Sequence, residues 1–473
     1  MEKLDIKKEN PYEVLRFFKE ISNIPRKSGN ERNIRNYLVK FALDRNLEIY
    51  TDKYYNVIIR KQSNTNINNQ EYIAFQAHTD MICEKEIWSD HDFDISPIEL
   101  LKDGDFIKAN GTTLGADNGI GVAFMLALLD SSETNSLNLE CIFTVQEETT
   151  MVGVKYIDTS IIKSKKIISL DNGKEGKMVI NSANCMEWFG KINKKYINTT
   201  NLVTYELNFA NFPGGHSGGD ISDLKRGNPI KLGFDILSKL DDVYINSVSG
   251  GSAVNIIPRD FKIQFSCSKD SENFIKDEIS ILKNIYGNNV VIEIKKINNI
   301  ATALSQNISQ NIINFINSFE NGALKFDKDN NQILSANFGA INEFNDYIRF
   351  DFSLRSNNVD FKESYINNLE QSIKENNIEI IWNQELYGFE TNSNIPLVQK
   401  TCSLYKSLFK KDMELIVTQG VLEGGFFQNR IKNLQYICIG ADTFDAHSPS
   451  ERVSLASIQR MWKFLKLLCK QEF

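Results

Sequence analysis

The chain has 473 residues, too many for one ordinary domain, and 41% of them are hydrophobic, which is enough to build more than one core. A formal net charge of −7 with 24% charged residues is typical of a soluble acidic protein, and no basic stripe favours a nucleic acid or a membrane as partner. The composition therefore predicts two globular domains and argues against nucleic-acid-binding and membrane-bound classes of protein.

Four apolar runs in the outer parts of the chain predict buried strands, and a polar motif comes at or after the end of each. The runs are residues 71–77, 139–145, 166–170 and 435–440. The motifs are, in the same order, Ala77-His78-Thr79-Asp80, Glu147-Glu148, Leu170-Asp171-Asn172-Gly173 and Ala446-His447-Ser448-Pro449. Open α/β sheets place reacting groups beyond the carboxyl ends of their strands, so we expect these side chains to gather at one edge of a sheet.

A fifth motif, Gly115-Ala116-Asp117-Asn118-Gly119, lies in a glycine-rich turn between the first two of these strands. It leads into the small and apolar residues 120–129, which predict a buried helix. The carboxylate of Asp117 would either cap that helix or bind a metal ion.

The residue types in these motifs are those that a pair of divalent metal ions requires. Zinc in a hydrolase binds imidazole nitrogen and carboxylate oxygen and keeps one position open for water. In two-metal sites the ions lie roughly 3.5–4 Å apart, so one carboxylate must bridge them. Each motif alone is more often a turn or a solvated face, and the hypothesis of a metal site depends on their combination.

The spacing of residues within two motifs suggests which side chains bind metal and which support the reaction. Residues 78 and 80 are two apart, so on an extended chain both point to the same side and Asp80 can orient His78. Glu147 and Glu148 are adjacent, so their side chains diverge. One glutamate could then coordinate metal while the other approaches the reacting water as general base.

The long middle segment predicts an inserted domain. We expect residues 1–186 and 391–473 to form one α/β catalytic domain and residues 187–390 to form an α+β domain between them. In the insert, strands 205–210, 244–249, 260–267 and 290–296 alternate with helices 223–240 and 272–286 in the β-α-β-β-α-β order of a ferredoxin-like unit. A second such unit is expected from helices 311–319 and 362–375 with strands 332–338, 347–354 and 378–382.

The cysteines and the amino terminus indicate the cellular compartment of the protein. The 7 cysteines are scattered, odd in number and mostly in apolar contexts, which is typical of reduced thiols. The amino terminus lacks the apolar stretch of a signal peptide, and no run of ~18 apolar residues occurs. We therefore expect a cytoplasmic protein.

At this point the sequence resembles a known family, the co-catalytic zinc aminopeptidase-like group that includes aminoacylase and many dipeptidases. Its aminoacyl-histidine dipeptidase subgroup, also called peptidase D, is most similar. The strings that carry the resemblance span nearly the whole chain. They are Gln76-Ala-His-Thr-Asp-Met-Ile82, His91-Asp-Phe-Asp-Ile-Ser-Pro-Ile98, Ala109-Asn-Gly-Thr-Thr-Leu-Gly-Ala-Asp-Asn-Gly-Ile-Gly-Val122, Glu147-Glu-Thr149, Phe212-Pro-Gly-Gly-His-Ser-Gly218 and Ala446-His-Ser-Pro-Ser-Glu-Arg452.

The resemblance implies a zinc-peptidase catalytic domain with an inserted lid domain, and two metal ions that share Asp117 as a ligand. The implied ligands are His78, Asp117 and Asp171 for one ion and Asp117, Glu148 and His447 for the other. Glu147 matches the general base of the family, and Asp80 matches the residue that supports His78. Zinc is the expected metal, although the same ligands accept manganese or cobalt.

Three residues of the insert match positions that contact substrate in relatives. His216 lies in a glycine-rich string and corresponds to a histidine that stabilises the tetrahedral oxyanion, in some relatives across a dimer interface, which allows a homodimer through the lid domain. Asn255 and Arg355 also match, and the planar fork of arginine suits a carboxylate. The alternatives are a histidine bonded to its own turn, a strand-edge turn at Asn255 and a surface ion pair at Arg355.

The resemblance implies that the enzyme hydrolyses small peptides, as a dipeptidase of the Xaa-His type. The same chemistry would serve an N-acyl amino acid or longer-peptide hydrolase, and a catalytically silent peptide-binding protein is the alternative from another class. One departure affects substrate choice. The subgroup usually carries a His-Ala-Gly-Leu-Glu-Cys-Gly string where this chain has Gln419-Gly-Val-Leu-Glu-Gly-Gly425, so the histidine is replaced by Gln419.

Overall fold

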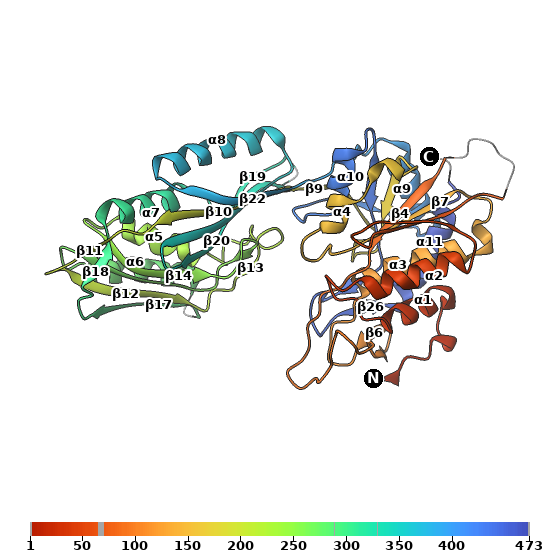
Figure 1. Ribbon diagram of the computed structural model, residues 1–473, viewed down its shortest axis with the longest axis horizontal. Coiled ribbons are helices and arrows are strands. Elements are labelled where there is room, and N and C mark those ends of the chain that lie inside the picture. Colours follow the sequence, from red (N-terminus) through yellow and green to blue (C-terminus); the bar gives the residue numbers. More distant parts are fainter. Residues whose placement is uncertain (1, 65–70, 288, 329, 472–473) are drawn as a thin grey trace. The chain divides into compact units, whose positions relative to one another are not determined.

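The computed structural model describes residues 2–64, 71–287, 289–328 and 330–471 (Figure 1). Contacts within the chain define two units. Unit 1 comprises Met1–Ser182, Phe389–Val417 and Leu422–Phe473, and unit 2 comprises Ala183–Gly388 and Thr418–Val421. These limits differ by a few residues from the predicted domain limits, and they assign residues 418–421 to unit 2 instead of the catalytic part.

The main sheet of unit 1 has the strand order β2-β3-β7-β4-β8-β24-β9-β23. Its parallel centre consists of β4 (Ile73–His78), β7 (Leu139–Thr144), β8 (Lys166–Ser169) and β24 (Gln435–Cys438). Nearly all residues of these strands are buried, because a parallel sheet is covered on both faces. The outer strands are β2 (Glu48–Thr51), β3 (Val57–Lys61), β9 (Lys177–Ser182) and β23 (Glu414–Thr418). The four predicted strands are therefore confirmed.

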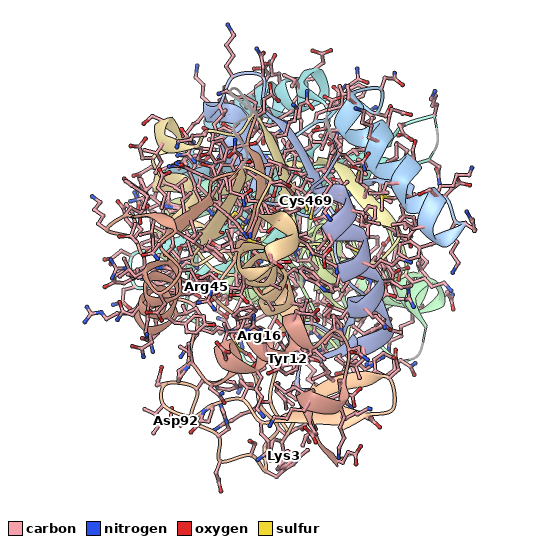
Figure 2. The ribbon with its side chains drawn as sticks, turned by 90° about the vertical axis from the view of Figure 1, so that its right-hand side faces the viewer. Lys3, Tyr12, Arg16, Arg45, Asp92 and Cys469 are labelled. Atoms are coloured by element: carbon pink, nitrogen blue, oxygen red, sulfur yellow. The ribbon has the colours of Figure 1, made fainter. Side chains whose placement is uncertain are left out.

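Helix α3 (Ala116–Asp130) is the predicted buried helix, and it packs against α1, β4 and β7. Its residues 118–129 are buried. At its amino end, the main chain of Asp117 and Asn118 has non-helical dihedral angles. At its carboxyl end, Asp130 binds Arg16 and Arg45, which Figure 2 labels on the face of unit 1. The other helices of unit 1 are α1 (Tyr12–Ser22), α2 (Arg32–Leu43), α4 (Val152–Tyr156), α9 (Pro396–Phe409), α10 (Gly424–Arg430) and α11 (Leu455–Leu468).

A smaller antiparallel sheet joins the beginning and the end of unit 1. Its strand order is β1-β5-β6-β26-β25. The strands are β1 (Glu2–Lys3), β5 (Leu100–Asp103), β6 (Phe106–Ala109), β25 (Thr443–Phe444) and β26 (Arg452–Ser454). Strand β26 pairs with β6, whose chain continues to Asp117, and the loop between β25 and β26 carries His447.

Unit 2 is built on one long antiparallel sheet with the order β17-β12-β16-β14-β20-β21-β10-β22. In its first half the elements follow the predicted β-α-β-β-α-β order. They are β12 (Val203–Ala210), α5 (Pro229–Ser238), β14 (Tyr244–Gly251), β16 (Phe261–Cys267), α6 (Glu272–Tyr286) and β17 (Val291–Ile297). In the second half the same order is made by β10 (Asn184–Asn193), α7 (Gln306–Ser318), β20 (Gln332–Glu343), β21 (Tyr347–Ser356), α8 (Val359–Glu375) and β22 (Glu379–Leu386).

The bounds of several elements of unit 2 differ from the predicted ranges, and two of the differences are informative. Helix α5 begins at Pro229 and not at residue 223, because the Asn228 side chain accepts hydrogen bonds from the first turn and proline suits the first helical position. Strand β10 was not predicted, and it pairs with both β21 and β22. It supplies the first strand of the second half, although it precedes the whole first half in the sequence.

The helices of unit 2 pack over its sheet, α5 against α7 and α7 against α8 (Figure 1). A short pair of strands, β13 (Gly215–His216) and β15 (Ile256–Ile257), carries His216. Among the helices of the described residues, none has the length and apolar character needed to span a membrane.

Candidate active site

Strand register brings the polar motifs of unit 1 to one edge of the main sheet. His78, the last residue of β4, pairs with Thr144, the last residue of β7, and Gln76 pairs with Ser169 at the end of β8. The three strands therefore end close together. Glu147 and Asp171 follow two of these strand ends within three residues.

Five side chains form a continuous cluster at this edge. The Nε2 atom of His78 lies 3.2 Å from Oδ1 of Asp117 and 3.5 Å from Oδ1 of Asp171. The Nε2 atom of His447 lies 2.9 Å from Oε1 of Glu148 and 3.5 Å from Oδ2 of Asp117. Asp117 thus contacts one imidazole with each of its two oxygens, which is the arrangement that a bridging carboxylate needs. The side chain does not cap α3, so of the two roles considered for it the helix cap is wrong.

The cluster satisfies the requirements of a metal site. His78, Asp117 and Glu148 each offer a ligand atom, and these atoms lie within 4.8 Å of one another. Imidazole nitrogen with carboxylate oxygen is a donor set for zinc and its neighbours in the first transition series. The residues present therefore fit divalent metal ions.

The carboxylates of the cluster also change the pKa values of its two histidines. Burial would lower the pKa of His78, but the carboxylates of Asp171 and Asp117 raise it well above its usual value. Hydrogen bonds with Asp117 and Glu148 raise the pKa of His447 to about 11. Burial would raise the pKa of Asp117, yet the two histidines hold it well below its usual range. The carboxylates of the cluster therefore create a negative potential that favours a bound cation.

Asp80 connects three parts of the cluster. The Nδ1 atom of His78 lies 3.2 Å from the main-chain oxygen of Asp80 and 3.4 Å from its carboxylate. The same carboxylate accepts hydrogen bonds from the main-chain N–H groups of Glu147 and Glu148, at 3.1 and 3.3 Å, and from the Ser28 hydroxyl at 2.7 Å. Asp80 therefore orients the two glutamates as well as the histidine, and only the latter role was expected from the spacing.

Glu147 lies among other acidic groups. Burial raises the pKa of Glu147 well above its usual value, His78 opposes this rise, and the carboxylates of Asp171, Glu148 and Glu423 add to it. A carboxyl with a raised pKa holds a proton more readily, which suits a group that must accept one and later return it.

The sequence analysis gave Glu423 no role. Its carboxylate accepts a hydrogen bond of 2.6 Å from the Thr144 hydroxyl and another from the Gln76 amide, and burial raises its pKa to about 8. Because Gln76 and Thr144 belong to β4 and β7, Glu423 supports the ends of the two strands. The only signal in the sequence is an acidic residue within an otherwise apolar and glycine-rich string.

His216 and Asn255 lie together in unit 2. The main-chain N–H of Ser217 donates a 2.9 Å hydrogen bond to the main-chain oxygen of Asn255. The N–H groups of Gly218 and Gly219 donate to Nδ1 of His216, at 3.1 and 3.2 Å. This histidine is therefore bonded to its own turn, which was the alternative considered for it. Because Nδ1 accepts, the neutral ring carries its proton on Nε2, where it is a donor.

Gln419 joins Arg355 to the His216 loop. Arg355 is buried and donates a 2.9 Å hydrogen bond from Nη1 to the main-chain oxygen of Gln419, so a surface ion pair is wrong. A Cβ atom at Gly218 would lie 3.0 Å from the same oxygen, so glycine permits this close approach. The side-chain amide of Gln419 donates to the oxygens of Gln332 and Asn357. The three residues matched to substrate contacts thus belong to one connected region of unit 2.

The model of Peptidase family M20/M25/M40 matches residues 74–471 of the chain. The protein belongs to this family. The chain is 26% identical over 475 residues to the cytosol non-specific dipeptidase of Escherichia coli K12, with 98% of each covered. Its fold is similar to that of aminoacylhistidine dipeptidase from Vibrio alginolyticus, with a TM-score of 0.85, 25% identity and coverage of 99% of this chain and 98% of the other.

Aminopeptidase PepT from Bacillus cereus, at 14% identity, shares the fold with a TM-score of 0.58 and coverage of 98% of each chain. These matches confirm the resemblance that the motifs indicated and the α/β fold with a catalytic and a lid domain. The protein is therefore a hydrolase of a metallopeptidase family.

Proposed function

We propose that the protein is a dipeptidase that uses two divalent metal ions, with zinc as the expected metal. The observation that carries this proposal is the position of Asp117, whose two oxygens contact His78 and His447 separately. With Asp171 beside His78 and Glu148 beside His447, each half of the cluster offers one imidazole and one carboxylate in addition to the shared one. Two of the relatives named above, from Escherichia coli and Vibrio alginolyticus, are named as dipeptidases, which supports the same substrate class here.

Metal ions at this cluster would polarise the scissile carbonyl and make water easier to deprotonate. Glu147 takes the proton from the attacking water and returns it to the amine that leaves. Asp80 fixes the ring of His78 and holds the main chain at Glu147, so the base stays in place during both transfers.

The connected region of unit 2 supplies the substrate contacts in this proposal. His216 donates from Nε2 to the oxygen that becomes negative in the tetrahedral state. Arg355 binds the terminal carboxylate of the substrate with the N–H groups that Gln419 does not occupy. Asn255, which lies beside His216, contacts the peptide group.

A panel of substrates tests the function. The metal-free protein is reconstituted separately with zinc, manganese and cobalt and is assayed with dipeptides, tripeptides and N-acetyl amino acids. Turnover of dipeptides in preference to the other two classes supports the proposal. Preference for tripeptides or N-acetyl amino acids would instead indicate the alternative hydrolase, and peptide binding without turnover at full metal loading would indicate a silent binding protein.

Two further parts of the proposal concern the setting of the enzyme. The name of the Escherichia coli relative places that protein in the cytosol, and we propose a cytoplasmic location here too. We also propose that two copies associate through unit 2. Measurement of the molar mass in solution, with the intact chain and with substitutions on the exposed face of unit 2, tests this association.

A further inference from the structure

Glu451 binds the main chain of the segment that carries Asp117. The Glu451 side chain is almost fully buried, with 2% exposure, and its two oxygens accept hydrogen bonds from four consecutive N–H groups. The bonds are 2.8 Å from Leu114 and 2.9 Å from Gly115 to Oε2, and 2.8 Å from Ala116 and 3.2 Å from Asp117 to Oε1. Glu451 lies in the same β25–β26 loop as His447, so one carboxylate ties the Asp117 segment to the His447 segment.

Arg26 binds the same segment from another side. Its exposure is also 2%, and its Nη1 atom donates 3.1 Å hydrogen bonds to the main-chain oxygens of Thr79 and Asp80, which directly follow His78. Its Nη2 atom donates to the main-chain oxygen of Gly115. One guanidinium therefore ties the His78 segment to the Asp117 segment.

The close fit explains a glycine in the Asp117 motif. Gly115 has a φ of +67°, and a Cβ atom there would lie 2.5 Å from Nη2 of Arg26. A side chain at this position would therefore be strained and would also displace the guanidinium. The segment lies against Arg26 because it has no side chain at this point.

The two buried charges compensate each other. A buried ion without a partner is strongly unfavourable, so an isolated Arg26 or Glu451 would destabilise the fold. Burial lowers the pKa of Arg26, and Glu451 is the first of the acidic groups that oppose this change. The hydrogen bonds of the Arg26 guanidinium and the Glu451 carboxylate go to main-chain groups.

We propose that Arg26 and Glu451 are positioning residues that set the spacing of His78, Asp117 and His447. They form a charged clamp on the main chain, so that Asp117 reaches both halves of the cluster. This inference rests on the proposed two-metal function. It predicts a specific effect on metal binding and not only a loss of stability.

Substitutions that keep size but change hydrogen bonding test the clamp. In Glu451→Gln an NH2 group replaces one carboxylate oxygen, so it would face two N–H donors whose hydrogen bonds it cannot accept. Glu451→Asp keeps the charge but is too short to reach all four donors. In Arg26→Lys the ammonium cannot span two main-chain segments as the guanidinium does. Any of these variants that folds provides the test.

Unit 1 contains a matched control. Glu140, at the amino end of β7 and so at the opposite end from His78 and Thr144, is fully buried and accepts a 2.7 Å hydrogen bond from Arg60. It also accepts hydrogen bonds from the main-chain N–H groups of Lys163 and Ser164. Glu140→Gln and Arg60→Lys therefore disturb an equally buried pair that holds main chain away from the cluster.

The measurements are zinc affinity by competition with a chelator, the visible spectrum of the cobalt-substituted protein and the melting temperature of the metal-free protein. We expect the clamp variants to lose about 10–100-fold in metal affinity and to change the cobalt spectrum. The controls should lose at least as much melting temperature while keeping affinity and spectrum.

Two outcomes would overturn the clamp. One is wild-type affinity and spectrum in the clamp variants, and the other is loss of affinity in the controls in proportion to their loss of stability. A wild-type protein that binds metal but does not cleave dipeptides would overturn the proposed function instead, and the affinity measurements would still decide the clamp.

Discussion

The polar cluster of unit 1 and the connected region of unit 2 are built in different ways. In unit 1, imidazoles and carboxylates contact one another directly, and strand register places His78 beside the segments that follow β7 and β8. In unit 2, His216 and Arg355 are held by main-chain N–H and C=O groups of loops. A shift of strand register would move every side chain of the strand, whereas a few substitutions can alter a loop. The comparison suggests that chemistry resides in the first region and that substrate choice can vary in the second.

Removal of Asp117 should have the largest effect on this comparison. In Asp117→Ala both halves of the cluster lose their shared ligand, so we expect both metal ions and all peptide hydrolysis to be lost. Elemental analysis after reconstitution with zinc is the measurement. A normally loaded variant would remove Asp117 from the site.

Asp80→Ala is the comparison for that variant. Asp80 acts on His78 and on the main chain of the glutamates, so its loss should weaken metal affinity or activity by about 10–100-fold and leave measurable metal bound. Equal metal loss in both variants would mean that Asp80 is as essential to binding as the shared ligand.

Glu147→Gln should separate chemistry from metal binding within unit 1. The amide cannot accept the proton of water, so we expect a loss of at least ~10²-fold in kcat, while metal content stays near wild type because the ligands are untouched. The rate should be measured at full metal loading and saturating dipeptide. Substantial activity under those conditions would refute the role of Glu147 as general base.

Arg355→Lys should weaken substrate binding by unit 2 and leave metal binding by unit 1 unchanged. Lysine keeps the charge but loses the paired donors, and a hydrogen bond to a charged group contributes about 1.5–3 kcal/mol. We expect KM to rise by about 10–100-fold with unchanged metal content. Arg349, on the same strand, binds Asp351 at 2.9 Å, so Arg349→Lys is the matched control. An unchanged KM in Arg355→Lys would exclude contact with the substrate carboxylate.

The two regions also differ in how far the sequence alone predicts them. The buried strands were predictable because apolar runs have a simple pattern, and the motifs stand next to them. Strand β10 was missed because its partners β21 and β22 lie far along the chain. Arg26, Glu423 and Glu451 were missed for a related reason. They act through contacts with distant strands or main-chain groups, and such contacts leave no local motif.

The smallest expected effect concerns Gln419, where the chain departs from its subgroup. Its main-chain oxygen binds Arg355 whatever the side chain is, while its amide donates to Gln332 and Asn357. Gln419→His should therefore keep Arg355 in place, while it removes the two hydrogen bonds of the amide and introduces an imidazole.

If the histidine of the subgroup contacts the substrate side chain, Gln419→His should shift the relative kcat/KM values in favour of dipeptides that end in histidine. One hydrogen bond accounts for about 1–3 kcal/mol of discrimination. Asn357→Ala is the control, because it removes one of the two acceptors of the Gln419 amide without introducing an imidazole. A similar shift in both variants would attribute the effect to the shape of the loop, and an unchanged preference in Gln419→His with normal metal content would place the specificity determinant elsewhere. A shift in Gln419→His alone would show that substrate choice in unit 2 can change while the metal cluster of unit 1 stays the same.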